Sequence, residues 1–193
     1  MGRNYFCCRR QAVVESLRII PYVAGRQSLV FSAITISTMN LQSHTAARTD
    51  ALVAQISAEP LDAARLLGLL EGARSVRCGG LVLFSGEVRE FNHGQTVARL
   101  EYEAYTALAV KTMREILTAA AERWSLGAAG CIHRVGTLTP GESAVLVVTA
   151  AAHRAEAYAA NQYVIQRVKH EAPIWKKEVY ADGTHVWGHN CEH

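Results

Sequence analysis

Two strand-like stretches decide the fold: Leu81-Val-Leu-Phe-Ser-Gly-Glu-Val88 and Val97-Ala-Arg-Leu-Glu-Tyr-Glu-Ala-Tyr105. Both are rich in β-branched, aromatic and other apolar residues, which is typical of strands. Between them lies Asn92-His93-Gly94, and Asn and Gly are residues that tight turns accept at little cost. We therefore expect two strands that pair antiparallel across this turn.

Three amphipathic helices are predicted around these strands, because apolar residues recur there at helical spacing. The first begins at Pro60 and ends near Gly72, the second covers residues 106 to 124 and is stopped by Gly127, and the third covers residues 154 to 170. Their apolar positions are Leu61, Ala64, Leu67 and Leu70, then Val110, Met113, Leu117, Ala120 and Trp124, then Tyr158, Ile165 and Val168.

The remaining extended segments complete the predicted order of elements. One strand and one helix come first, and pairs of strands separated by single helices follow. Strands are predicted for residues 51–56, 129–135, 144–151 and 174–180, with a hairpin turn at Thr139-Pro-Gly-Glu142 and another turn at Asp182-Gly183 toward Trp187. Hairpins without a run of strand–helix–strand crossovers favour the α+β class. We expect a mainly antiparallel sheet with flanking helices.

Composition indicates one globular domain without a membrane span. Of the 193 residues, 50% are apolar and 19% are charged, as in globular chains, and no apolar run reaches the roughly 18 to 20 residues that a bilayer requires. The five cysteines form no C-x-x-C pair, so reduced thiols and a cytoplasmic location are expected.

The basic character of the chain belongs to its first 50 residues, where six arginines face two acids; the net charge of +3 leaves −1 for the remainder. We predict that residues 1–50 are an extension and residues 51–193 are the folded domain. Three interpretations of the extension compete: a disordered tail, a transit-like segment, or upstream sequence that precedes a true start at Met39. The third is favoured. A nucleic-acid binder would need its basic face in the folded part, so that function is disfavoured.

Lysine is scarce and clustered, which suggests a chemical use. Only four of the 20 basic residues are lysines, and Lys169, Lys176 and Lys177 fall within nine residues of one another. An amine can lose its proton near neutral pH and an arginine cannot. Strand alternation places Lys176 on one face with Glu178 and Lys177 on the other, so Lys169 plus one strand lysine is the plausible pair. Chance clustering on a solvated strand stays open, and Lys111 is interpreted as a structural surface residue.

A candidate anion site lies where a strand passes into the third helix, at His153-Arg154, because free N–H groups and two basic side chains converge there. The alternative is that His153 only caps the helix and Arg154 is solvated. Arg89, at the end of a strand, is a further cation that could meet a ligand. His133 lies inside a strand and is interpreted as a hydrogen-bonded core or interface residue.

No metal site and no resident cofactor are predicted. The ending holds His185, His189, Cys191 and His193, yet it lacks the spacing of zinc sites, so adventitious binding is favoured. Neither a glycine-rich nucleotide loop nor a nucleophile elbow is present, which disfavours ATP and serine-hydrolase chemistry.

Five blocks taken together resemble the molybdopterin synthase large, catalytic subunit family, over roughly residues 53 to 187. They are Phe84-Ser-Gly-Glu-Val-Arg89, Leu100-Glu-Tyr-Glu-Ala-Tyr105, Ile132-His-Arg-Val-Gly136, Ala152-His-Arg154, and Lys169 followed by Pro173-Ile-Trp-Lys-Lys-Glu178. The last is the most specific. The ending after Trp187 is short for this family, which puts in doubt any contact made by a longer C-terminal segment.

The resemblance implies a hammerhead-type α+β fold and a sulfurtransferase activity. Sulfur would pass from the C-terminal Gly-Gly thiocarboxylate of a small ubiquitin-like subunit to cyclic pyranopterin monophosphate, within a heterotetramer built on a homodimer of this chain. The family's essential lysines fall on Lys169 and Lys176, and its substrate-binding cluster falls on Arg89, His153 and Arg154. A non-catalytic module that binds a ubiquitin-like partner is the alternative.

Overall fold

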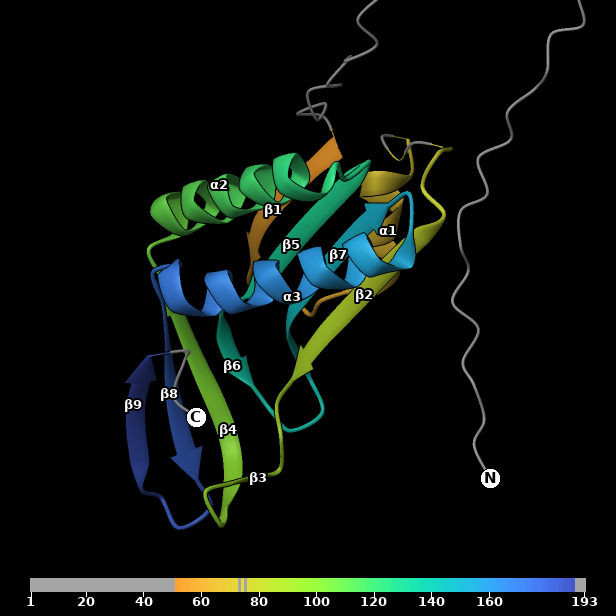
Figure 1. Ribbon diagram of the computed structural model, residues 1–193. Coiled ribbons are helices and arrows are strands. Elements are labelled where there is room, and N and C mark those ends of the chain that lie inside the picture. The colour runs from red at the N-terminus through yellow and green to blue at the C-terminus, as the bar shows by residue number, and fades with distance from the viewer. Residues whose placement is uncertain (1–50, 73, 75, 190–193) are drawn as a thin grey trace, which may run out of the picture. The chain divides into compact units, whose positions relative to one another are not determined.

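The computed structural model describes residues 51–189 except 73 and 75. These residues form two sheets and three helices, and their arrangement can be followed in Figure 1. The predicted extension at residues 1–50 lies outside the described residues, as do Cys191 and His193. In chain order the elements are β1 (Leu52–Ser57), α1 (Ala63–Glu71), β2 (Gly80–Glu87), β3 (Phe91–Asn92), β4 (Gln95–Ala104), α2 (Thr106–Trp124), β5 (Ala128–Arg134), β6 (Gly136–Leu138), β7 (Ser143–Ala151), α3 (Arg154–Glu171), β8 (Ile174–Tyr180) and β9 (His185–His189).

A four-stranded sheet in the order β1-β5-β7-β2 forms the centre of the core. Only the β1–β5 pair is parallel. Helices α2 and α3 cover one face of this sheet (Figure 1), and α1 packs on the other. A side chain at Gly130 would place its Cβ 2.9 Å from Leu66 Cδ1 and 3.2 Å from Leu70 Cδ1. The glycine therefore allows α1 to sit directly on β5.

The second sheet has five strands and is antiparallel throughout, in the order β3-β4-β8-β9 with β6 also paired to β4. The long strand β4 pairs with both β8 and β6. Because β6 follows β5 after one residue, the chain passes directly from the first sheet into the second and returns as β7.

The predicted hairpin between residues 81–88 and 97–105 is wrong. Strand β2 pairs with β7, with Leu83 opposite Val148, and β4 pairs with β8, with Leu100 opposite Glu178. The turn at His93 and Gly94 exists, with φ of 50° and 80°, but it joins the short β3 to β4. Strand β7 is buried along almost its whole length, so it needs a strand on each side, and β2 supplies one of them.

Smaller differences concern helix ends and faces. Helix α1 begins after the N-cap Asp62, two residues beyond Pro60, and it buries Leu66 and Leu70 while Ala64 is exposed. Helix α2 covers the predicted residues and ends at Trp124, but the residue that terminates it is the C-cap Ser125, in the left-handed conformation, and not Gly127.

The third helix buries Ile165 and Val168 as predicted, but not Tyr158. Tyr158 is 64% exposed, and Asn161 is buried instead, donating hydrogen bonds to the carbonyls of Val82 and Val147 at 3.2 and 3.1 Å. The short strand β6 was not predicted. The α+β class with mainly antiparallel strands and flanking helices is nevertheless confirmed.

Among the described residues, no helix is long and apolar enough to cross a membrane. In the same part of the chain, no group of three or more His, Cys, Asp or Glu side chains could hold a metal ion.

Candidate active site

Polar side chains gather on one face of the five-stranded sheet, around Lys176. The register places Tyr102 of β4 opposite Lys176 and Leu100 opposite Glu178. Lys176 Nζ lies 2.6 Å from Glu178 Oε1, and the two side chains are only 16% and 9% exposed. Shielded from water, this ion pair holds the amine in one position.

The same carboxylate connects Lys176 to strand β3. Glu178 Oε2 accepts hydrogen bonds from Asn92 Nδ2 at 2.7 Å and from the Tyr180 hydroxyl at 2.8 Å, and Arg89 Nη2 donates to Asn92 Oδ1 at 2.8 Å. Burial alone would raise the pKa of Glu178, but the hydrogen bonds from Lys176, Asn92 and Tyr180 outweigh it and hold the pKa below its ordinary value. Arg89 and Lys176 thus belong to one network.

Lys169, in the last turn of α3, approaches this network from the helix side. Burial lowers the pKa of His133, and the positive charge of Lys169 adds a smaller effect in the same direction. The His133 ring meets the Tyr102 ring edge-on, with centroids 5.0 Å apart. Burial, and then the negative charge of Glu178, raises the pKa of Tyr102 to about 12. The structure therefore brings Lys169, Lys176 and Arg89 to one region.

Lys177 points away from this region. Its Nζ lies 3.0 Å from Glu101 Oε2 and 5.7 Å from the centre of the Trp187 ring. The two neighbouring lysines diverge, as strand alternation predicts.

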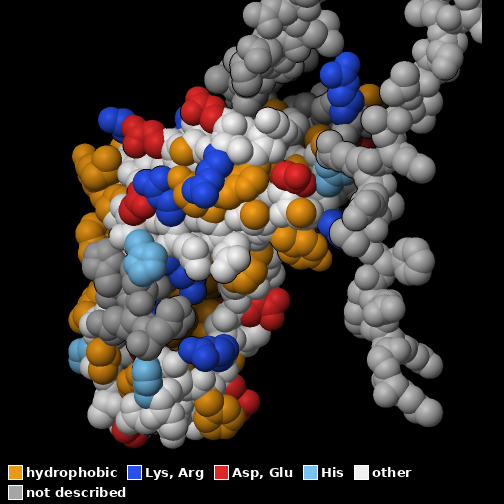
Figure 2. Space-filling view, in the orientation of Figure 1, with side chains coloured by type: hydrophobic (Ala, Val, Ile, Leu, Met, Phe, Trp, Pro, Cys, Tyr) orange, Lys and Arg blue, Asp and Glu red, His pale blue; other side chains and the backbone are white. Residues whose placement is uncertain are grey.

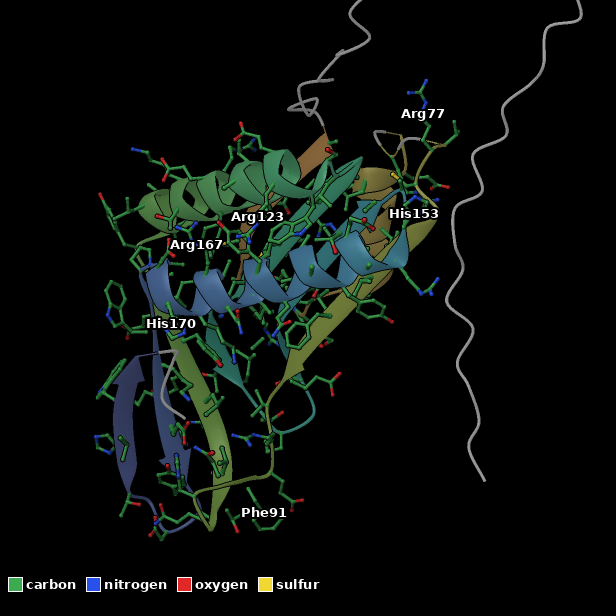
Figure 3. All side chains as sticks on the ribbon, viewed as in Figure 1. Arg77, Phe91, Arg123, His153, Arg167 and His170 are labelled. Carbon is green, nitrogen blue, oxygen red and sulfur yellow. The ribbon has the colours of Figure 1, made fainter. Side chains whose placement is uncertain are left out.

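His153 and Arg154 lie at the opposite end of α3 (Figure 3, where His153 and His170 mark the two ends of the helix). Arg154 precedes Lys169 by fifteen residues, which corresponds to about 22 Å along a helix. Both side chains are exposed, and the His153 side chain makes no capping hydrogen bond. Within one chain, the five predicted site residues therefore form two separate groups.

A second cationic surface lies over α2 and α3, where Figure 2 shows Lys and Arg side chains among hydrophobic ones. Arg123 stacks on Trp124, 4.5 Å from the ring centre, and Arg167 is paired with Glu171 and stacked on Tyr163. These guanidinium groups are engaged with rings or a carboxylate. The arginines of this surface therefore contribute to the packing of α2 against α3.

Four residues of the network were not predicted as site residues: Tyr102, Glu178, Asn92 and Tyr180. Strand alternation had placed Glu178 beside Lys176, so that signal was available in the sequence. Asn92 was interpreted only as a turn residue, and no local pattern marks Tyr102, because its place depends on the pairing of β4 with β8.

A sequence profile of the family described as "MoaE protein" matches residues 56–171. The chain belongs to the MoaE family. Among curated relatives, this MoaE-family chain is similar to the molybdopterin synthase catalytic subunit of Bacillus subtilis (strain 168), with 37% identity over 138 residues, 72% of this chain and 86% of the relative. It is 42% identical to the subunit of that name from Staphylococcus epidermidis (strain ATCC 12228 / FDA PCI 1200) over 58% of this chain and 75% of the relative.

Solved structures agree with this MoaE membership. The crystal structure of molybdopterin synthase from Staphylococcus aureus matches with a TM-score of 0.64 and 35% identity, over 70% of this chain and 96% of that one. A complex of subunits 1 and 2 of molybdopterin-converting factor from Helicobacter pylori 26695 has the same fold, with a TM-score of 0.57 and 24% identity over 72% of this chain and 90% of that one. The family resemblance found in the sequence is confirmed.

Proposed function

We propose that this MoaE-family chain is the catalytic subunit of a molybdopterin synthase, a sulfurtransferase of molybdenum cofactor biosynthesis. It would move sulfur from the C-terminal thiocarboxylate of a small ubiquitin-like subunit to cyclic pyranopterin monophosphate. The observation that carries the proposal is the Lys176–Glu178 pair at 2.6 Å, with Lys169 approaching the same sheet face, in a chain whose relatives are named molybdopterin synthase catalytic subunits.

The chemistry requires fixed cations, because a thiocarboxylate and a substrate phosphate are both anions. Lys169 would meet the thiocarboxylate, while Lys176 is oriented by Glu178. Together they would stabilise the oxyanion and transfer protons as the thiocarboxylate sulfur bonds to the pterin side chain. Water would then cleave the acyl C–S bond and release the tail of the partner as a carboxylate. Arg89, which reaches Lys176 through Asn92 and Glu178, would contribute to the seat of the phosphate.

We further propose that the chain works as a homodimer, because His153 and Arg154 of the same copy are too far away to act with Lys169. Strand β2 lies at one end of its sheet, and its outer positions Leu81 and Leu83 are 39% and 40% exposed. Antiparallel pairing of β2 with its counterpart across a two-fold axis would bring the His153 end of one copy toward Arg89 of the other. The phosphate seat would then be shared between two copies.

The small subunit would bind with its tail near Lys169 and Lys176. With one small subunit on each copy of the homodimer, the assembly would be a heterotetramer. The related protein described as a complex of subunits 1 and 2 supports such a partner. We place the protein in the cytoplasm, because its cysteines form no C-x-x-C pair in the sequence. We also propose residues 51–193 as the catalytic domain and residues 1–50 as a dispensable extension.

The test is reconstitution of sulfur transfer. The purified full chain is mixed with thiocarboxylated small subunit and cyclic pyranopterin monophosphate, and molybdopterin is measured as its oxidised fluorescent derivative. Lys169→Ala should lower the rate about 10²- to 10⁴-fold. Lys111→Ala removes a 71% exposed lysine of α2 and should change nothing. Full transfer by Lys169→Ala would refute the assignment, and a bound partner without any product would favour a binding module.

Mixing two inactive variants tests the shared seat. Lys169→Ala and Arg154→Ala each remove one cation of the proposed shared active site, one from each copy, and a co-refolded mixed dimer would hold one intact site. About a quarter of the wild-type activity should return if copies pair at random and each site works alone. If mixing restores nothing while each variant still dimerises, the seat lies within one copy.

A further inference from the structure

Asn92 joins Arg89 to Glu178 in the candidate site, and the proposed reaction gives it no role of its own. It is the last residue of β3 and is followed by His93 and Gly94, whose φ angles are 50° and 80°. Two successive residues with positive φ are the mark of a tight two-residue hairpin turn. The turn therefore fixes where the Asn92 side chain starts.

The side-chain amide of Asn92 uses both of its ends. Its Oδ1 accepts a hydrogen bond from Arg89 Nη2 at 2.8 Å, and its Nδ2 donates one to Glu178 Oε2 at 2.7 Å. A guanidinium only donates and an ionised carboxylate only accepts, so these two partners allow a single direction of the amide. The amide is thus held in one orientation between a cation and an anion.

The Glu178 end of this connection is the fixed one. The Glu178 side chain is 9% exposed, its Oε1 lies 2.6 Å from Lys176 Nζ, and its Oε2 also accepts from the Tyr180 hydroxyl at 2.8 Å. A carboxylate that is held by two further partners and shielded from water has little freedom to move. Its charge is already offset by that of Lys176, so Asn92 is attached to an ion pair with no net charge.

The Arg89 end is different, because this guanidinium is exposed and its partner is neutral. Within residues 51–189, no carboxylate forms a salt bridge with Arg89. The neighbouring cations of the five-stranded sheet, Arg99, Lys176 and Lys177, are each paired with a glutamate. Arg89 is therefore held in place without losing its positive charge to an acid of this part of the chain.

We infer that Asn92 is a positioning residue for Arg89: its amide holds the guanidinium beside the Lys176–Glu178 pair and leaves the positive charge available to an anionic group of the substrate. A carboxylate at this position would also hold the guanidinium, but it would offset the charge. A side chain without an acceptor would not hold it. The meaning of this contact for the reaction rests on the proposed function, whereas the contact itself does not.

Two substitutions of Asn92 separate holding from charge. Asn92→Asp keeps an acceptor of the same size for Arg89 but adds a negative charge, and Asn92→Ala removes the acceptor and adds none. Thr96→Asp is the matched control. Thr96 is exposed and stands opposite Phe91, so the same charge is added to the other face of the same hairpin.

The readout is the reactivity of the Arg89 guanidinium. Each full-length variant is treated with phenylglyoxal, and labelling of Arg89 is quantified by mass spectrometry against Arg114, an exposed arginine of α2. Asn92→Asp should slow the labelling of Arg89 about threefold, because an exposed ion pair forms. Asn92→Ala and Thr96→Asp should not slow it. Thermal unfolding verifies that each variant is folded.

Unchanged labelling of Arg89 in folded Asn92→Asp would overturn the inference. Equal slowing in Asn92→Ala would do the same, because the cause would then be a rearranged turn. Equal slowing in Thr96→Asp would trace the effect to added charge anywhere on the hairpin, with the same consequence.

Sulfur transfer is then measured on these variants with thiocarboxylated small subunit. Asn92→Asp and Asn92→Ala should each raise KM for cyclic pyranopterin monophosphate about tenfold, with a smaller change in kcat, because binding of the anion is weakened. Thr96→Asp should match the wild type. A fall in kcat at unchanged KM would contradict the role given to Asn92. If the wild type transfers no sulfur while the labelling pattern holds, the proposed function fails and the positioning of Arg89 stands.

Discussion

The two sheets differ in what their buried faces carry. In the four-stranded sheet, β5 and β7 are buried almost throughout, mainly by apolar side chains such as Val147 and Val148, which are fully covered. The covered face of the five-stranded sheet instead holds Tyr102, Lys176 and Glu178. One sheet removes apolar surface from water, and the other places charges where each needs a partner.

This difference separates an apolar core, which stabilises the fold, from a network of buried charges, where the proposed function places the reactive groups. Removing a buried apolar contact does not change the charges elsewhere in the protein. Removing one member of a buried charge network leaves another charged group without its partner. Variants in the first sheet should therefore alter the free energy of unfolding, and variants in the second should alter reactivity or pH dependence.

The largest stability effect is expected for Leu66→Ala, which removes a fully buried side chain that packs on Gly130. The free energy of unfolding, measured by urea denaturation, should fall by about 2 to 5 kcal/mol, because a cavity is left beneath α1. Sulfur transfer per folded molecule should not change. A loss of transfer in the folded variant would break the division between the two sheets.

The next effect is a pH dependence of stability that His133 confers. Its pKa is about 4 in the folded protein and 6.5 ordinarily, so the unfolded chain binds a proton that the folded one refuses. The stabilisation is complete above pH 6.5 and is lost as the pH falls toward 4, by about 3 kcal/mol in all.

Urea denaturation between pH 7 and 4.5 measures this dependence before the lowered pKa values of Glu178 and Glu142 come into play. In His133→Asn the corresponding part of the slope should vanish. Parallel stability curves for the variant and the wild type would show that the pKa of His133 is not lowered in the folded state.

The smallest effect is expected for Lys177→Gln, on the open face of the five-stranded sheet. Its pair with Glu101 joins side chains that are 22% and 28% exposed, and such pairs contribute below about 1 kcal/mol. Lys176→Gln, one position away, should instead abolish most sulfur transfer because it removes the partner of Glu178. Equal losses of transfer in both variants would contradict the assignment of the two lysines to different faces.

Local periodicity was sufficient to predict the helices and the core strands, because spacing reports which face of an element is buried. It could not predict that β2 pairs with β7 rather than with β4, since strand partners are chosen by the burial of the whole sheet. For the same reason Tyr102 was missed: its place beside Lys176 exists only through the register of β4 with β8.

Some neighbours of the candidate site residues could be predicted from the sequence, but the grouping of these residues could not. Alternation along β8 placed Lys176 and Glu178 on one face, and the structure shows them bonded. The separation of His153 and Arg154 from Lys169 was already implied by the predicted helix over residues 154–170, whose length keeps its ends apart. The resemblance grouped these residues by role, and a role carries no information on the distance between two residues within one chain.

The short strand β6 couples the unfolding of the two sheets. It lies between β5 and β7 along the chain, yet it is bonded to β4 in the other sheet, with Leu138 opposite Leu100. Separation of the five-stranded sheet from the rest of the protein would thus distort the segment that joins β5 to β7, the two most buried strands of the core. The lysine region cannot open as an independent flap, so its backbone amides should gain hydrogen-exchange protection close to that of global unfolding.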